Sequence, residues 1–315
     1  MDDSSLINEF QESFPAEWAE LKKLYFRLKL RRFLIIVSIV FIVLAIALYF
    51  SSFENSFELS LIPGILGIGA FYFAYFQLKN PTFNYAEISA LSIPLLIHLN
   101  TWNIEYEYKA KPHLREFQAS RLYPFSLSNL NGKHFFSGIA KKLPFIAWFV
   151  EAEYVDKVGE SPLSMISSRS AFNGYTGIQI MVKNLVPHLN GIVVIEKGQD
   201  EDLIRLDQYY KSNAKWKPLS SDDIGLKRQY NFYTPIENPQ NALDQLVVNK
   251  VTKLKSASSK PFSLSIRRKH VYLNQYWNAD YASFNLKKGL SENIISLNRS
   301  LKELIELSFI LALPS

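Results

Sequence analysis

Two uncharged apolar segments near the N-terminus constrain this chain more than any other feature. Residues 33–50 and residues 61–78 each run for 18 residues without Asp, Glu, Lys, Arg or His, and ten residues separate them. A helix rises ~1.5 Å per residue, so each segment just reaches across a hydrocarbon core of ~30 Å. Core helices of soluble proteins rarely continue so far without a charge. The sequence therefore predicts a two-helix transmembrane hairpin that inserts in the lipid bilayer.

The distribution of Lys and Arg predicts the orientation of this hairpin. The basic residues that flank the two segments are Lys22, Lys23, Arg27, Lys29, Arg31, Arg32 and Lys79. The connecting residues 51–60 contain two Glu and no basic residue. Because positive charge stays on the cytoplasmic side, we expect both termini in the cytoplasm, in an inner or plasma membrane protein. No small-residue cleavage pattern follows the first segment, so we expect it to be retained.

The chain divides into three expected regions. Residues 1–32 form an N-terminal amphipathic cytoplasmic helix, residues 33–78 the hairpin, and residues 79–315 a cytoplasmic domain. Within the first region, the acidic residues 1–12 are expected to be frayed, and one helix is expected from 14 to 50. The apolar stripe of this helix predicts either a homo-oligomer or packing against the protein's own cytoplasmic domain. Small residues among the apolar ones of the second span allow close helix packing, namely Gly64, Gly67 and Gly69.

The cytoplasmic domain is expected to be α+β, with antiparallel sheet or sheets and several packing helices. The patterns predict strands at 104–108, 135–138, 147–154, 172–182, 192–196, 228–234, 262–266 and 271–276. They predict helices at 84–99, 114–122 and 200–210, a helix capped by Asn238 and a last helix capped by Ser291. Residues 216–223 are expected to be a polar loop, and residues 174–177 a turn or bulge. The spacing contains few βαβ units, which favours α+β over a doubly wound sheet.

No motif for catalysis, cofactor binding or metal binding is evident. The chain has no Cys, which excludes disulfides, thiolate zinc sites and cysteine nucleophiles. None of the five His residues has another at a helical spacing, and no Walker or dinucleotide-binding loop occurs. We therefore expect neither cofactor nor metal. The candidates for a pocket assembled in three dimensions are His134, Glu151 and Glu153, although the two Glu equally fit a solvated strand face.

The soluble part carries a net positive charge. Residues 79–315 contain 29 Lys and Arg against 21 Asp and Glu, a net charge of +8. Such a surface can attract anionic lipid head groups, or it is an ordinary surface beside an anionic membrane. Because the basic residues are spread along the chain, with residues 267–269 as the only run of three, no nucleic acid partner is expected.

Several short motifs resemble a bacterial family catalogued as domain of unknown function 3137. Residues 116–123 (EFQASRLY) are similar to its E-F-x-x-S-x-L-F pattern, and residues 136–138 with 149–151 resemble its S-G and F-x-E strand pair. Residues 172–175 with 189–194 resemble a further pair of family motifs. The resemblance implies a basic N-terminal helix, two close membrane spans and a cytoplasmic α+β domain, and it implies no activity.

Three functional hypotheses follow from the sequence. The first is a membrane-anchored cytoplasmic binding or scaffold module, without enzymatic activity, that binds a protein partner. The second is a membrane-tethered enzyme whose site forms only in three dimensions. The third is a module that binds anionic lipid through basic residues near the spans.

Overall fold

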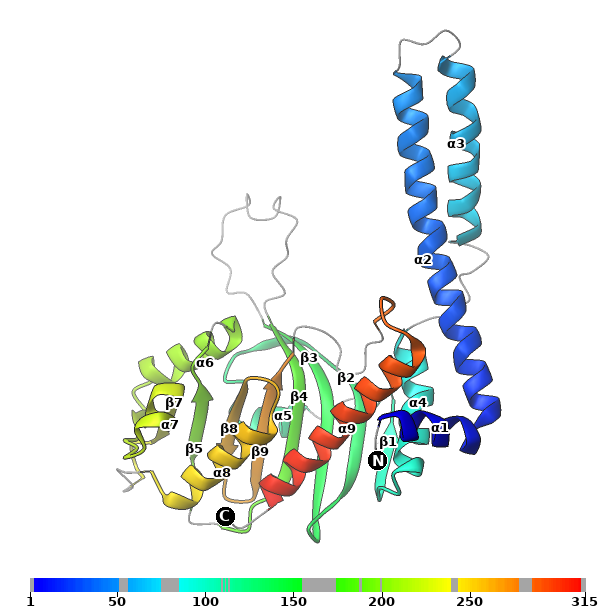
Figure 1. Ribbon diagram of the computed structural model, residues 1–315. Helices are drawn as coiled ribbons and strands as arrows, with labels where there is room; N and C mark the ends of the chain where they lie inside the picture. Colours follow the sequence, from blue (N-terminus) through cyan, green and yellow to red (C-terminus); the bar gives the residue numbers. More distant parts are fainter. Residues whose placement is uncertain are drawn as a thin grey trace. The chain divides into compact units, whose positions relative to one another are not determined.

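The computed structural model describes residues 3–50, 56–74, 85–108, 110, 112, 114–154, 174–186, 189–198, 200–238, 243–277 and 285–312 (Figure 1). They fall into two compact units. One contains Met1–Thr101 and Ala282–Asn298, and the other contains Trp102–Tyr281 and Arg299–Ser315. The two units divide after residue 101 and again inside the last helix.

The first unit is helical. Its helices are α1 (Asp3–Ser13), α2 (Pro15–Tyr49), α3 (Ser56–Tyr72), α4 (Tyr85–Leu99) and the beginning of α9 (Leu290–Ala312). The single helix predicted for residues 14–50 is confirmed as α2, which begins with proline in its first turn. The expectation of a frayed N-terminus was wrong, because α1 is a helix that buries Leu6, Ile7 and Phe10.

Helix α2 is the one helix of the described residues that is long and apolar enough to cross a membrane. Its apolar window is only 6% buried, so these side chains are not the core of a soluble fold. This supports membrane association. Helix α3 is also apolar but shorter, with 17 residues, and residues 75–79 lie outside the described residues. The structure thus shows one candidate span, and the predicted second span remains a prediction.

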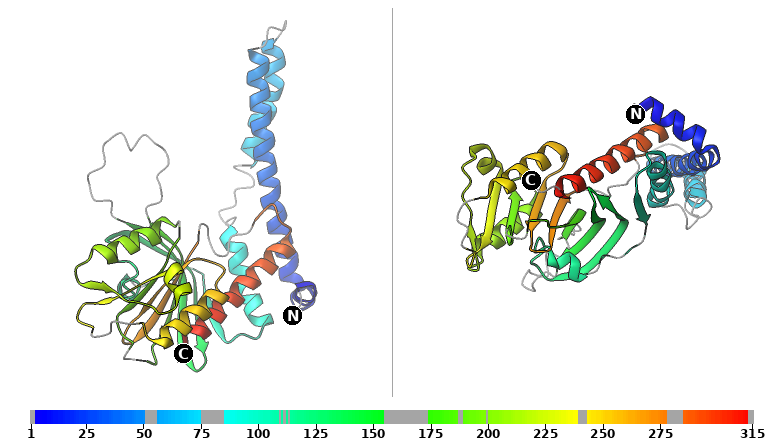
Figure 2. Two further views of the ribbon diagram at one scale, coloured as in Figure 1. Left: turned by 60° about the vertical axis from the view of Figure 1, so that its left-hand side comes forward. Right: turned by 90° about the horizontal axis from the view of Figure 1, so that it is seen from below.

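Helices α2 and α3 lie side by side (Figures 1 and 2). Gly67 lies at their contact, where an added Cβ would come 3.0 Å from Ile42 Cγ1 and 3.1 Å from the Ser38 carbonyl oxygen. A Cβ on Gly64 would touch Ala45, whereas one on Gly69 would meet no atom within 4 Å. Two of the three glycines noted in the sequence therefore permit close helix packing, and the third does not contribute to it.

The second unit contains a nine-stranded sheet among the described residues. The strands are β1 (Ile104–Glu107), β2 (Leu127–Ala140), β3 (Leu143–Tyr154), β4 (Gly174–Lys183), β5 (Ile192–Glu196), β6 (Trp216–Pro218), β7 (Tyr230–Pro235), β8 (Phe262–Ile266) and β9 (His270–Tyr276). Their order is β1-β2-β3-β4-β9-β8-β5-β7-β6, and all pairs are antiparallel. The predicted α+β class with an antiparallel sheet is confirmed.

Helices pack on both faces of this sheet. Helices α5 (Leu114–Ala119) and α6 (Glu201–Ser212) cover one face, where Phe117 and Leu203 join a buried cluster with Trp148. Helix α8 (Gln245–Ala257) and residues 299–312 of α9 lie on the other face. Glu303 of α9 accepts a hydrogen bond from Gln275 of β9 at 2.8 Å. Helix α7 (Ile224–Gln229) precedes β7.

Several predicted boundaries were wrong for local reasons. Residues 216–218, expected in a loop, form β6, and residues 228–229, expected in a strand, end α7. Helix α8 is capped by Asp244, whose carboxylate accepts from the Leu246 N–H. Asn238 instead donates to Thr234 Oγ1 at 2.9 Å, and Ser291 lies inside α9. Capping residues are common in loops, so sequence alone does not tell which one the helix uses.

Gly177 belongs to a regular strand rather than to the predicted turn or bulge. It pairs with Val150 on one side and Tyr276 on the other. A Cβ at this position would lie 1.9 Å from the Gln275 carbonyl oxygen, so only glycine fits. Gly177 lets the neighbouring strand come close. A glycine in the sequence fits this role as well as a turn, so the sequence alone does not distinguish the two.

Candidate functional site

The three residues predicted to form a pocket lie on β2 and β3. Glu151 and Glu153 share one face of β3, as their spacing predicted. Glu151 forms an ion pair with Lys133 at 3.1 Å and is partly exposed. The three cavities described below, at the β8–β9 turn and beside α6, are not lined by these glutamates or by His134. The placement gives no support to the hypothesis of an enzyme site at these residues.

His134 is buried within the sheet. It occupies a bulge of β2 between Lys133 and Phe135, with a positive φ of 51°. Its side chain is fully buried, and Nδ1 makes a 2.7 Å hydrogen bond with the Tyr106 hydroxyl. Its ring also stacks on that of Tyr106. These contacts fix the bulge and the pairing of β1 with β2.

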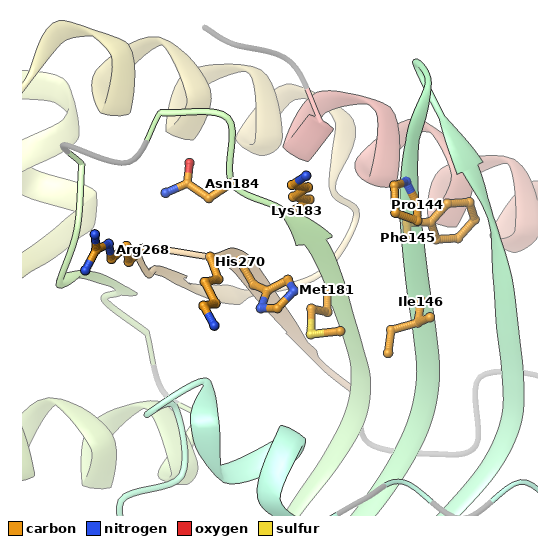
Figure 3. A pocket seen from close by; sticks show the side chains of 9 residues that line it. Pro144, Phe145, Ile146, Met181, Lys183, Asn184, Arg268 and His270 are labelled. Atoms are coloured by element: carbon orange, nitrogen blue, oxygen red, sulfur yellow. The ribbon is translucent and has the colours of Figure 1, made fainter.

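A different site is formed where β3, β4 and the β8–β9 turn meet (Figure 3). It is an open cavity of about 490 Å³. Four of its lining residues are basic, namely Lys183, Arg268, Lys269 and His270. No Asp or Glu lines it. The cavity therefore presents positive charge from two segments that are far apart in the sequence.

The floor of this cavity is apolar. Ile146 of β3 and Met181 of β4 are register partners in the sheet, and Figure 3 shows them on neighbouring strands beside His270. Both are only partly buried, although they pack against the buried cluster that contains Trp148. Pro144 and Phe145 complete the apolar lining. An uncovered apolar floor beneath a basic rim is a surface on which a ligand can bury area.

Asn184 holds the basic turn in place. Its backbone N–H donates to the Lys269 carbonyl at 2.8 Å, and its side-chain amide donates to the Arg267 carbonyl at 2.6 Å. The turn closes through Arg267 N–H to the His270 carbonyl at 2.9 Å. Arg268 and Lys269 have negative φ, so the turn lacks the primed geometry that two-residue hairpins favour. The Asn184 bonds compensate by tying this turn to the end of β4.

The basic groups of the rim are available to an external anion. Among the described residues, none of the four forms an ion pair. Burial lowers the pKa of His270, the nearby Glu116 carboxylate opposes this shift, and Lys269 and Lys183 reinforce it. His270 is therefore mostly neutral at pH 7, and the positive charge comes from Lys183, Arg268 and Lys269.

Two smaller cavities lie beside α6 and β7, with volumes of about 340 and 350 Å³. Asp207 lines the first and is fully engaged with its neighbours. It accepts from the Tyr233 hydroxyl at 2.6 Å and from the Asn231 amide at 2.7 Å, and it pairs with Lys211. Burial and the Asp207 hydrogen bond raise the pKa of Tyr233, which keeps this hydroxyl protonated. The cluster ties α6 to β7 and is structural.

Sequence reasoning found only part of the basic cavity. The sequence shows residues 267–269 as the only run of three basic residues, between the strands predicted at 262–266 and 271–276. Sequence reasoning missed Lys183, Ile146 and Met181, because their approach depends on the pairing of β4 with β3 and β9. The sequence signal for these residues was the pattern of β4, an apolar strand that ends at the basic residue Lys183.

Comparison with family models, with curated proteins and with solved structures finds no match to this chain. The fold and cavity therefore define the class at the level of structure: an α+β protein with an apolar N-terminal helix that fits a membrane anchor. The resemblance to the family of unknown function, the protein partner and the homo-oligomer stay predictions.

Proposed function

We propose that this chain is a membrane-anchored binding module that holds an anionic group of its ligand in the basic cavity. The observation that carries the proposal is the cavity itself: three cationic side chains without acidic partners, positioned by Asn184 around an apolar floor. Charge complementarity of this kind gives specificity and speeds association. The exposed apolar surface of α2 supports the anchoring part of the proposal.

The proposed topology has two spans, a short outer loop and both termini in the cytoplasm. The basic residues at the start of α2 and the absence of Lys and Arg from residues 51–60 support it. Cysteines introduced one at a time at Ser52 and Ser220 test it, since the chain has no Cys of its own. In intact cells, an impermeant thiol reagent should label the cysteine at 52 only. Labelling at 220 would overturn the topology.

The binding proposal is tested by site-specific photo-crosslinking in living cells. A crosslinking amino acid replaces Lys269 at the cavity rim or, as the control, Arg228, which is exposed on α7 and lines none of the cavities described. Position 269 should capture a molecule that position 228 does not. The double variant Lys183→Gln/Arg268→Gln should abolish this capture, because with Lys269 already replaced by the crosslinker it removes the two remaining cations.

The outcomes of this experiment are distinct. Loss of capture in the double variant, with normal membrane localisation, supports the proposal. Equal capture with and without the two cations, or equal capture from 228, would sink it. The chemical class of the captured molecule separates a protein partner from a lipid.

A second candidate function, binding of anionic lipid by α2, rests on one observation. Lys22, Lys23, Lys29 and Arg32 are exposed on the same helix that continues into the apolar window. Each such residue near an anionic surface contributes about 1 kcal/mol, and the attraction decays within a Debye length. In vesicles that contain the full chain, phosphatidylserine should bind at these residues at low salt and be released at high salt. Binding that did not change with salt would exclude this function.

A further inference from the structure

We infer that the ligand of the basic cavity is an amphiphilic anion, a phosphate or carboxylate group carried on a short apolar body. The inference rests on the proposed function and adds the chemical class of the ligand. Its basis is that the cavity combines two environments. Cations surround its mouth, and the side chains of Ile146 and Met181 form its floor.

The sheet register places the cationic and the apolar environment one after the other along the strands. Lys183 and His270 are register partners at the ends of β4 and β9. One pleat further in, on the same face, Met181 pairs with Ile146 on one side and with Tyr272 on the other. An anion bound at Lys183 would therefore lie at one end of an apolar strip formed by Ile146 and Met181.

A simple anion would leave this strip uncovered. Ile146 and Met181 are partly exposed, although their neighbours Trp148 and Tyr272 in the same cluster are buried. The volume of about 490 Å³ also exceeds what a phosphate group fills. An apolar body beside the anion would bury the strip and gain affinity of about fourfold for each methylene taken out of water.

Binding of soluble probes to the full chain in phosphatidylcholine nanodiscs tests the inference. Octyl phosphate supplies both an anion and an apolar tail. Inorganic phosphate supplies the anion alone, and octanol supplies the apolar tail alone. Octyl phosphate should bind roughly 100-fold more tightly than inorganic phosphate, the gain expected from three to four buried methylenes. Octanol should bind weakly. Equal affinities of octyl phosphate and inorganic phosphate would overturn the inference.

Variants separate the two parts of the site. Met181→Gln should weaken octyl phosphate roughly tenfold, as expected when about two methylenes lose their contact, and leave inorganic phosphate unchanged. Leu185→Gln, at an exposed leucine that does not line the cavity, is the matched control. Lys183→Gln/Arg268→Gln should weaken both anions. Tight binding of octyl phosphate in all three variants would place it elsewhere on the protein.

A measurement on the unaltered protein guards against a variant that fails to fold. The chain has three methionines, so methyl-labelled methionine gives a simple spectrum in which Met181→Leu identifies the Met181 signal. Octyl phosphate should shift this signal, and inorganic phosphate should not. No shift would overturn the inference. If crosslinking at 269 still captured a partner in a cation-dependent manner, the proposed binding function would stand, although the ligand would not be an amphiphilic anion.

A final competition measurement identifies the source of the amphiphile. In nanodiscs that contain phosphatidic acid, weaker apparent binding of octyl phosphate would show that a membrane lipid occupies the site. Unchanged binding would show that the site takes a free amphiphile. A phosphatidic acid that competes equally well in Met181→Gln and in the unaltered protein would contradict a role for the apolar floor.

Discussion

At the scale of single residues, the sheet face beneath α5 and α6 contains a buried polar pair that the fold does not fully satisfy. Gln179 of β4 and Asn274 of β9 are register partners with no exposed surface, and the Gln179 amide donates to Asn274 Oδ1 at 3.1 Å. Gln179 Oε1 and Asn274 Nδ2 have no hydrogen-bond partner among the described residues. A buried group left in this state costs about 1–3 kcal/mol, and a bridging water would reduce that cost.

This pair gives a double-mutant prediction. Asn274→Leu alone should lower the free energy of unfolding by about 1–3 kcal/mol, because it removes the one acceptor of the Gln179 amide. Adding Gln179→Leu should recover most of the loss, since neither position then carries an unpaired polar group. Urea unfolding of the four proteins in the same detergent measures the cycle. Simple additivity of the two losses would show that the pair does not act as a unit.

A second residue, Asp202 in the first turn of α6, predicts a dependence of stability on pH. Burial raises its pKa to about 7, and the Asp200 carboxylate adds to this shift. A folded-state pKa above the unfolded value means that the native state binds more protons, so stability falls as pH rises from about 4 to about 7.

Asp202→Asn should therefore stabilise the protein, with a gain that grows between pH 4 and pH 7 and is constant above. Thermal unfolding across this range, compared with the unaltered chain, measures the gain. Asp222→Asn, at an exposed carboxyl in the loop before α7, is the control. A gain from Asp202→Asn that is the same at pH 4 and pH 8 would contradict the assignment.

At the scale of elements, amphipathic and alternating patterns predicted α2, α4, β5, β8 and β9 nearly to the residue. Elements stabilised by contacts outside themselves were missed. Helix α1 has an acidic sequence, and burial of Phe10 and its apolar neighbours stabilises it. Strand β6 has three residues and forms through its pairing with β7. Both depend on tertiary contacts that a local pattern does not contain.

The contact between α2 and α3 supports a prediction at this scale. Gly67→Leu should separate the two helices, because the new side chain would meet Ser38 and Ile42 at the backbone of α2. Gly69→Leu should leave them in contact, since that position is open. A disulfide between cysteines introduced at Ala45 and Gly64 reports the packing, and its yield should fall in the first variant only. Equal yields would show that Gly67 does not limit the approach.

At the scale of the whole molecule, the antiparallel α+β class could be predicted, but the strand order could not. Strands β2, β3 and β4 pair in sequence order, and sequence-adjacent strands are usually neighbours in a sheet. The insertion of β9 and β8 between β4 and β5 joins residues that are 68 to 99 positions apart. This same long-range pairing brings Lys183 beside His270, which explains why the cavity was found only in the structure.

The division of the chain into two units also affects how the protein folds during its synthesis. The unit that contains α2 is completed by residues 285–298, where the Tyr25 hydroxyl donates to the Lys288 carbonyl and Asn100 donates to Asn298 at 3.0 Å. At ~5–20 residues per second, synthesis of the roughly 200 residues in between takes on the order of 10–40 s. Helix α2 therefore leaves the ribosome well before its last packing partners exist. A nascent chain stopped at residue 281 would have α2 and all strands of its sheet, and the N-terminal unit would still lack the segment that completes it.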